Sequence, residues 1–343
     1  MFDLDSLVRR NVKYLEPYSS ARDEFHEGIG IFMDANENPY GRLNRYPDPY
    51  QKELKSSISR LKEVPQEKIF LGNGSDEIID LCYRIFCEPG KDKALIFPPT
   101  YGMYEVSAEI NDAGLIRIPL DRNFHIPVDD VIPLLSNPEL KLIFICSPNN
   151  PTSNSMRYED VLYIISNFRG MVIVDEAYND FSGKPSFKNL IGTNPNLIVM
   201  QTFSKALGMA AARIGIAFSD PAVIYYFNKM KPPYNISTIN QKAALERLEH
   251  QDLFKNQIKR IISERERLSA HLKKMKIIEQ VFPSDSNFLL VKTPDPELVY
   301  KSLVEKEIIV RNRSKQIPGC LRITVGTRVE NNRLLNALGN TKI

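Results

Sequence analysis

The chain has 343 residues, of which 25% are charged and 43% are hydrophobic, a balance typical of a globular protein with a sizeable core. Its formal net charge of +3 is too small to predict a nucleic-acid partner. The charged N-terminus lacks the apolar core of a secretory signal, and no apolar run reaches membrane-spanning length. We therefore expect a cytoplasmic protein without a membrane partner.

Cysteine and histidine usage limits the covalent and metal chemistry. None of the four cysteines forms a C-x-x-C pair, so we expect free thiols in a reducing compartment rather than a disulfide framework. The four histidines are scattered along the chain. No zinc-binding spacing results, and we predict no metal site.

The predicted elements divide the chain into an arm and two domains. Residues 1–30 are polar and irregular, which predicts an N-terminal arm, and residues 31–233 are predicted to form a large α/β domain. Continuous apolar runs alternate there with helical spacing, as expected for a mostly parallel sheet whose strands are buried on both faces. These runs cover residues 94–97, 142–146, 172–174, 197–200 and 214–218.

The last part of the chain, residues 234–343, is predicted to form a smaller α+β domain. The KPPYN segment at 231–235 breaks the preceding pattern, and a long charged helix is expected over roughly 238–276. Strands are then expected at 288–291, in IIVRNR and in LRITVG, with a helix near 296–306.

Polar side chains follow four of the predicted strands at the points where the strands end. Ligands of open α/β sheets bind beyond the carboxyl ends of the strands. An aromatic ring, an amide, a carboxylate with a phenol, and a hydroxyl with an amine are expected at this edge. The residues are Tyr101, Asn150, Asp175 with Tyr178, and Ser204 with Lys205.

These groups match the chemical needs of pyridoxal phosphate. The cofactor needs a lysine to bond to its aldehyde and a carboxylate to keep its ring nitrogen protonated. Its ring can stack on an aromatic face, and its phosphate needs an arginine and the N–H groups of a helix start, such as the one after Gly72. Singly, Asp175 could be a helix N-cap and Asn150 a turn residue. Their common position at one edge of the predicted sheet favours a cofactor-binding site over these structural roles.

Several motifs carry a family resemblance over essentially the whole chain. SPNNPT, VDEAY and TFSK, with an arginine eight residues after the TFSK lysine, resemble the class I/II aminotransferases of the aspartate-aminotransferase-like superfamily. The motifs LEPYSSARD, DANENPYG, NRYPDPY and GCLRITVGT resemble its histidinol-phosphate aminotransferase branch. The resemblance implies an aspartate-aminotransferase-like α/β fold and pyridoxal 5'-phosphate as cofactor.

The resemblance also implies roles for single residues. Lys205, Asp175 and Tyr178 would be catalytic: Lys205 bonds to the cofactor and moves a proton, Asp175 pairs with the ring nitrogen, and Tyr178 with Asn150 binds the phenolate oxygen. Tyr46 would reach the site of a neighbouring subunit, which implies a homodimer. The other implied cofactor contacts are Gly74, Ser75, Asp76, Tyr101, Ser204 and Arg213.

Arg322 is the implied ligand of the substrate carboxylate, and in this branch it also faces the substrate phosphate. An arginine fork matches a carboxylate, and a charge within apolar LRITV needs a partner. The other implied substrate-binding residues are Arg311, Tyr18, Arg22 and Asn36.

The implied reaction is transamination between L-histidinol phosphate or imidazole acetol phosphate and glutamate or 2-oxoglutarate in histidine biosynthesis. An aromatic-amino-acid aminotransferase and a threonine-phosphate decarboxylase are alternatives on the same fold. A non-catalytic binding protein is a third alternative, which the intact set of site residues disfavours. A nucleotide-binding protein is disfavoured because the glycine-rich phosphate motifs are absent from the sequence.

Two positions lead to structural predictions. Arg213 precedes the apolar run at 214–218, whereas the other site residues follow theirs. For all of them to share one edge, that strand must run antiparallel to an otherwise parallel sheet. Ser153 stands where this family usually has glycine, so its turn must either avoid a positive φ or tolerate strain.

Overall fold

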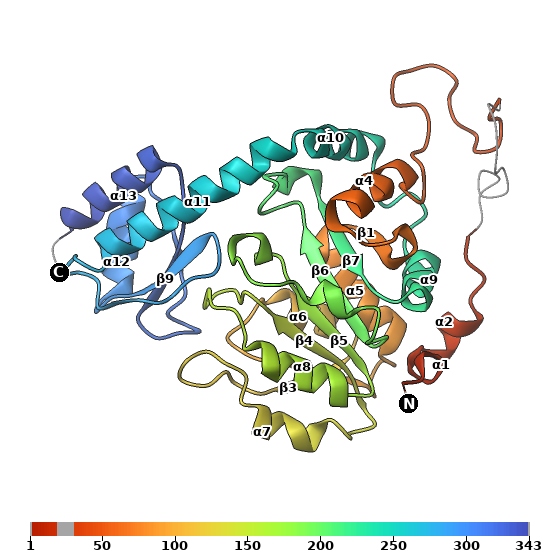
Figure 1. The fold of residues 1–343 in the computed structure, drawn as a ribbon, viewed down its shortest axis with the longest axis horizontal. Coiled ribbons are helices and arrows are strands. Elements are labelled where there is room, and N and C mark those ends of the chain that lie inside the picture. The colour runs from red at the N-terminus through yellow and green to blue at the C-terminus, as the bar shows by residue number, and fades with distance from the viewer. Residues whose placement is uncertain (1, 19–30, 342–343) are drawn as a thin grey trace.

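The computed structural model describes residues 2–18 and 31–341, which form two sheets flanked by helices (Figure 1). The larger sheet has seven strands in the order β1-β7-β6-β5-β4-β2-β3. Its strands are β1 (Ile69–Asn73), β2 (Lys93–Ile96), β3 (Gly114–Arg117), β4 (Leu140–Cys146), β5 (Met171–Asp175), β6 (Leu197–Thr202) and β7 (Ile214–Phe218).

Helices cover both faces of this sheet. Alternate residues of the strands point to opposite faces, and the side chains on each face pack with the helices there into a separate apolar core. Val172 and Val174 of β5 join the core under α4 (Lys52–Lys62), α8 (Tyr158–Asn167) and α10 (Thr238–Glu249). Ile173 joins the core under α5 (Gly74–Phe86), α6 (Met103–Ile110) and α9 (Pro221–Met230). Short helical turns complete this part of the chain: η1 (Gln66–Lys68), α7 (Val128–Val131), η2 (Ile132–Leu134), η3 (Asn179–Phe181), η4 (Phe187–Leu190) and η5 (Ala210–Ala212).

Strand β7 confirms the prediction of a reversed strand. It pairs antiparallel with both β6 and β1, whereas β6, β5, β4, β2 and β3 pair parallel with one another. The start of β7 therefore lies at the same edge as the ends of the other strands. Arg213, just before β7, is brought to that edge.

The smaller sheet is antiparallel throughout. It consists of β10 (Arg311–Asn312), β11 (Cys320–Thr324), β9 (Phe288–Lys292) and β8 (Gln280–Val281), in that order. Its core packs against α11 (Gln251–Leu272), α12 (Pro296–Glu305) and α13 (Arg328–Gly339). In Figure 1, α11 runs from beside α10 to this sheet. The boundary at 233/234 stays a prediction.

Some elements differ from the sequence prediction. The helix expected over 238–276 is two helices, α10 and α11, separated at His250, whose φ of −100° and ψ of 51° leave the helical region. The arm is not wholly irregular, because α1 (Leu4–Leu7) and α2 (Arg10–Tyr14) form short helices that bury Val8 and Val12. Among the residues that the structure describes, no helix is long and apolar enough to cross a membrane.

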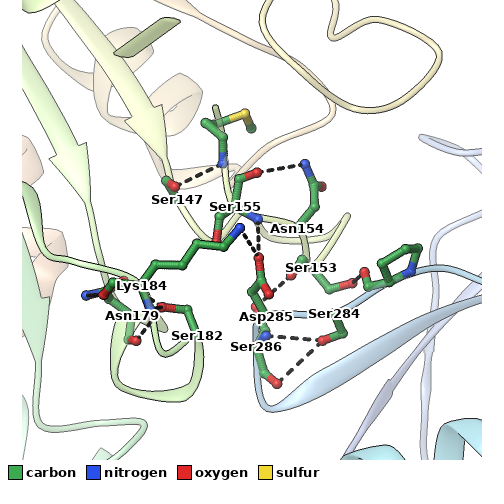
Figure 2. Close-up of polar contacts among 12 residues, drawn as sticks. Ser147, Ser153, Asn154, Ser155, Asn179, Ser182, Lys184, Ser284, Asp285 and Ser286 are labelled. Carbon is green, nitrogen blue, oxygen red and sulfur yellow. Dashed lines mark hydrogen bonds and ion pairs between the residues drawn. The ribbon is translucent and has the colours of Figure 1, made fainter. Parts of the chain in front are cut away.

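The two sheets are joined by a polar contact between residues 283–286, just before β9, and the turn at 151–155, just after β4 (Figure 2). Asp285 accepts hydrogen bonds from Ser155 N at 3.1 Å and Lys184 Nζ at 2.9 Å, and its own N–H donates to Ser153 O at 2.8 Å. Ser153 has a φ of +69°, so the turn adopts the glycine-like conformation despite its side chain. The Ser153 hydroxyl donates to Pro283 O at 3.1 Å.

Candidate active site

A cavity of about 430 Å³ lies at the strand-end edge of the larger sheet and faces β10 and β11 of the smaller one. Strand ends, the start of α5 and the small sheet all contribute side chains to it. Most residues singled out in the sequence line this one cavity: Ser75, Asp76, Tyr101, Asn150, Asp175, Tyr178, Ser204, Lys205, Arg213, Arg311 and Arg322.

Lys205 projects into the cavity from the loop that follows β6. Its Nζ lies 5.6 Å from the centroid of the Tyr178 ring. Burial in the cavity lowers the pKa of Lys205, and the positive charges of Arg322 and Arg213 lower it further, against the opposing effect of Asp175. The amine therefore loses its proton more easily than a free lysine does.

Asp175 ends β5 and is almost completely buried, with 3% of its surface exposed. Its Oδ2 accepts a hydrogen bond from Tyr104 Oη at 2.7 Å, and its Oδ1 accepts one from Ala177 N at 3.0 Å. Burial raises the pKa of Asp175, while these two hydrogen bonds favour the ionised form. A buried carboxylate held this way can pair with a cationic group in the cavity.

Asn150 and Tyr178 both contact side chains of the smaller sheet. Arg322 Nη1 donates a short hydrogen bond to Asn150 Oδ1, which leaves the amide N–H₂ of Asn150 as a donor for a ligand. Phe288 packs edge-on against Tyr178, with ring centroids 5.1 Å apart, and beneath the Arg322 guanidinium at 5.4 Å. The small sheet thus positions Arg322 beside two groups of the larger one.

The start of α5 forms a tightly fitted cradle against β7. Gly74 has a φ of +76°, and a Cβ there would lie 2.4 Å from Arg213 Nη2. A Cβ on Gly215 would lie 2.5 Å from Gly74 C and 2.6 Å from Ser75 N. The helix start therefore approaches β7 and Arg213 as closely as backbone allows, and helix N-termini attract anions such as phosphate.

Asp76 connects two of the predicted residues inside this cradle. Arg213 Nη2 donates to Asp76 Oδ2 at 3.0 Å, and Tyr101 Oη donates to Asp76 Oδ1 at 2.9 Å. The sequence singled out only the backbone of Asp76, and its carboxylate has a further effect: it fixes the orientation of the Tyr101 ring and the Arg213 guanidinium.

Three arginines gather where the small sheet faces the cavity. Arg311 and Arg322 are paired across β10 and β11, and Arg313 directly follows β10; all three line the cavity. Burial and the other two guanidinium groups lower the pKa of Arg313. Like charges opposite each other on a sheet are destabilising, so this cluster fits an anionic ligand.

Four predicted residues among those that the structure describes do not line the cavity, and one of them, Gly74, lies instead in the cradle against Arg213. Tyr46 stacks on Tyr234 with ring centroids 4.4 Å apart, and it lines a separate hollow together with Asn36. Tyr18 is exposed. Arg22 lies outside the described residues. The expected roles of these residues stay predictions.

Three site residues were missed in the sequence. Tyr104 lies inside a helix and shows no sign of its hydrogen bond to Asp175. Thr202 Oγ1 accepts from Ser204 N and contacts Ser204 Oγ, both at 3.1 Å, although it reads as the last residue of a buried strand. Only Arg313 carried a usable signal, because the Arg-x-Arg spacing within the expected strand predicts that it faces the same side as Arg311.

The sheet with one reversed strand and the cavity at its edge define the class of the protein. The family model described as "Aminotransferase class I and II" matches residues 25–338, and the chain belongs to this family. It is 51% identical, over 344 residues, to the histidinol-phosphate aminotransferase of Cytophaga hutchinsonii, an alignment that covers 98% of this chain and 99% of the relative.

Solved structures agree with this fold. The histidinol-phosphate aminotransferase from Clostridium acetobutylicum superposes with a TM-score of 0.80 at 26% identity, over 87% of this chain and 90% of that one. The enzyme of the same name from Sinorhizobium meliloti, solved in complex with pyridoxal-5'-phosphate, superposes with a TM-score of 0.78 at 23% identity, over 90% of this chain and 89% of that one.

Proposed function

We propose that this chain catalyses pyridoxal-phosphate-dependent transamination between L-histidinol phosphate and 2-oxoglutarate, giving imidazole acetol phosphate and glutamate, as in histidine biosynthesis. The observation that carries the proposal is the convergence of Lys205, Asp175 and Arg213 on one cavity at the helix start of α5. The name of the relative that is 51% identical supports the choice of substrate.

The residues of the cavity fit this cofactor. The Gly74–Gly215 contact leaves no room for a Cβ, and the N–H groups of Ser75 and Asp76 with Arg213 and Ser204 would hold the phosphate. When bound, pyridoxal phosphate supplies an aldehyde that takes up the amino group and a ring that accepts the electrons released at Cα. Tyr101 would cover one face of that ring.

The catalytic roles follow from the surroundings of each side chain. Lys205, with its lowered pKa, would take the proton from the substrate carbon that bears the amino group and deliver it to the former aldehyde carbon of the cofactor. Asp175 keeps a negative charge against the ring nitrogen. Asn150 and Tyr178 donate to the phenolate oxygen, and the side chains packed around them limit the access of water.

The arginine cluster supports a substrate that carries a phosphate. Arg322, next to Asn150, would bind the α-carboxylate of glutamate in one half-reaction and the phosphate of the second substrate in the other. Arg311 and Arg313 add two further charges that a dianion would neutralise better than a monoanion would. Tyr18, Arg22 and Asn36 would complete the pocket.

We also propose a homodimer that works in the cytoplasm. Segment 31–46 exposes large apolar side chains, among them Ile31, Met33 and Tyr40, each at least 84% exposed. Exposed apolar groups in such number are typical of an interface. In a dimer built on this segment, Tyr46 would reach the partner's cavity.

A substrate panel tests the proposed function. Purified protein with pyridoxal phosphate should convert histidinol phosphate in the presence of 2-oxoglutarate, and faster than it converts phenylalanine. Lys205→Ala should lower turnover by at least about 10⁴-fold, because no other amine replaces it. Preferential decarboxylation of threonine phosphate, preference for phenylalanine, or an active Lys205→Ala variant would each contradict the proposal.

A further inference from the structure

The ring of Tyr104 stands between the cavity and the core of the larger sheet. It belongs to α6 and is completely buried. It stacks on Phe144 with ring centroids 4.9 Å apart and meets Tyr101 edge-on at 5.6 Å. Tyr83 Oη, one layer deeper, donates to the backbone carbonyl of Tyr104 at 2.8 Å. The packing of the ring against Phe144 and Tyr101 fixes the direction of the Tyr104 hydroxyl, which donates to Asp175 Oδ2 at 2.7 Å.

Asp175 needs this hydrogen bond because its other surroundings do little to keep it charged. Burial raises its pKa, and the negative charge of Asp76 raises it further. The opposing groups are the Tyr104 hydroxyl, the Ala177 N–H and the more distant charge of Lys205. A carboxylate that accepts a charge-assisted hydrogen bond is stabilised in its ionised form, by more than a neutral pair would be.

The remaining titratable neighbours do not provide this effect. Three of them lie around Asp175: Tyr101 before α6, Cys146 at the end of β4 and Tyr178 after β5. Burial raises the pKa of each of these groups. Burial also raises the pKa of the Tyr104 hydroxyl, which keeps it a hydrogen-bond donor to the carboxylate.

We propose that Tyr104 is a positioning residue for the reaction: its hydroxyl holds the buried Asp175 carboxylate ionised and fixed in orientation at the cofactor site. The inference rests on the proposed function, because the ionised carboxylate matters only when a cofactor ring nitrogen is bound. Each Asp175 oxygen has one protein donor, Tyr104 or Ala177, so each keeps acceptor capacity toward the cavity.

The test compares Tyr104→Phe with Tyr83→Phe, which removes a hydroxyl from the same aromatic stack without touching Asp175. Removing the Tyr104 hydroxyl should raise the Kd of pyridoxal phosphate by roughly tenfold or more, the effect of losing a hydrogen bond to a charged group. The same variant should move the acid limb of the kcat profile to higher pH by about one unit, because its Asp175 takes up a proton more easily. KM for the amino-acid substrate should change little.

Tyr83→Phe should lower thermal stability but leave the Kd of the cofactor and the acid limb unchanged. Equal Kd values and acid limbs in wild-type and Tyr104→Phe protein would overturn the inference, as would equal shifts in both variants. Wild-type protein that does not bind pyridoxal phosphate would instead refute the proposed function.

If the Tyr104→Phe variant does not fold, a second measurement tests the inference without it. In Tyr83→Phe holoenzyme, proton NMR should still show one slowly exchanging tyrosine hydroxyl, because Tyr104 is buried and bonded to a carboxylate. Loss of every such signal would overturn the inference.

Discussion

At the scale of single residues, the proposed bond between Lys205 and the cofactor depends on the charge of Lys205. Only an uncharged amine condenses with an aldehyde and releases water. Burial lowers the pKa of Lys205, as do the guanidinium groups of Arg322 and Arg213. The cluster that suits an anionic substrate therefore also prepares the lysine for the cofactor.

This coupling predicts a pH dependence. The rate at which cofactor-free protein bonds to pyridoxal phosphate should rise with pH through the lowered pKa of Lys205. In Arg322→Gln, which removes one nearby positive charge, the pKa rises, so the midpoint should move to higher pH. Stopped-flow absorbance measures this rate. Arg333→Gln, an exposed arginine on α13, is the control. An unchanged or lowered midpoint in Arg322→Gln would contradict the coupling.

Whether a cavity residue could be predicted from the sequence depended on its position relative to the strand ends. Asp175, which ends β5, and Lys205, which closely follows β6, were predictable because strand ends meet at one edge. Tyr104 was not, since its contact depends on how α6 rotates against β5. The carboxylate of Asp76 was missed because only a fold can bring Tyr101 and Arg213 to it.

At the scale of elements, the fit of α5 against β7 controls the phosphate cradle. Gly215→Ala should place a Cβ 2.5 Å from Gly74 C, so the helix start must shift. We expect the Kd of pyridoxal phosphate to rise roughly tenfold or more. Fluorescence titration measures it. Gly192→Ala, where a Cβ would meet nothing within 4 Å, should bind as wild type does. Tight binding by Gly215→Ala would show that the cradle tolerates displacement.

The polar contact between the two sheets predicts a pH-dependent stability. Burial raises the pKa of Asp285, but hydrogen bonds from Lys184 and Ser155 outweigh it and leave the pKa below its ordinary value. The stabilisation is therefore present above the ordinary pKa near 3.8 and is lost as pH falls through the lower folded-state value.

Asp285→Asn should accordingly reduce the free energy of unfolding by about 1 kcal/mol at neutral pH, a modest value because Lys184 is half exposed. The difference from wild type should close as the pH falls through the lowered pKa of Asp285. Urea unfolding measures both. The exposed pair of Glu279 with Lys292 supplies the control variant Glu279→Gln, which should change little. A constant difference at all pH values would mean that the Asp285 charge has no part in it.

Strands that are buried on both faces were easier to predict from the sequence than strands that are partly exposed. Strands β4 to β7 are buried on both faces and gave continuous apolar runs. Strand β3 was missed because this edge strand is only half buried. Helix α13 was missed although Thr327 and Glu330 form a capping box at its start. The break at His250 left no signal because helical composition continues on both sides.

At the scale of the whole molecule, the exposed segment 31–46 predicts self-association. Wild-type protein should sediment at twice the chain mass of 39.3 kDa. The double variant Met33→Asp, Leu43→Asp should shift toward monomer, because charges would be buried at an apolar contact. Val329→Asp, at an exposed position on α13, should remain dimeric. A monomeric wild type would contradict the proposed homodimer, whereas a double variant as dimeric as wild type would place the contact elsewhere.

The reversal of β7 gives the loop at 203–213 an unusual mechanical property. Its two ends enter neighbouring strands, and Phe203 N donates to Ile214 O at 3.0 Å across its base. Lys205 and Arg213 therefore lie in one loop whose ends are held together by a backbone hydrogen bond. In the proposed function, the residue that bonds to the cofactor aldehyde and the residue that binds its phosphate would therefore move together if the sheet flexed, and bending would strain the bound cofactor little.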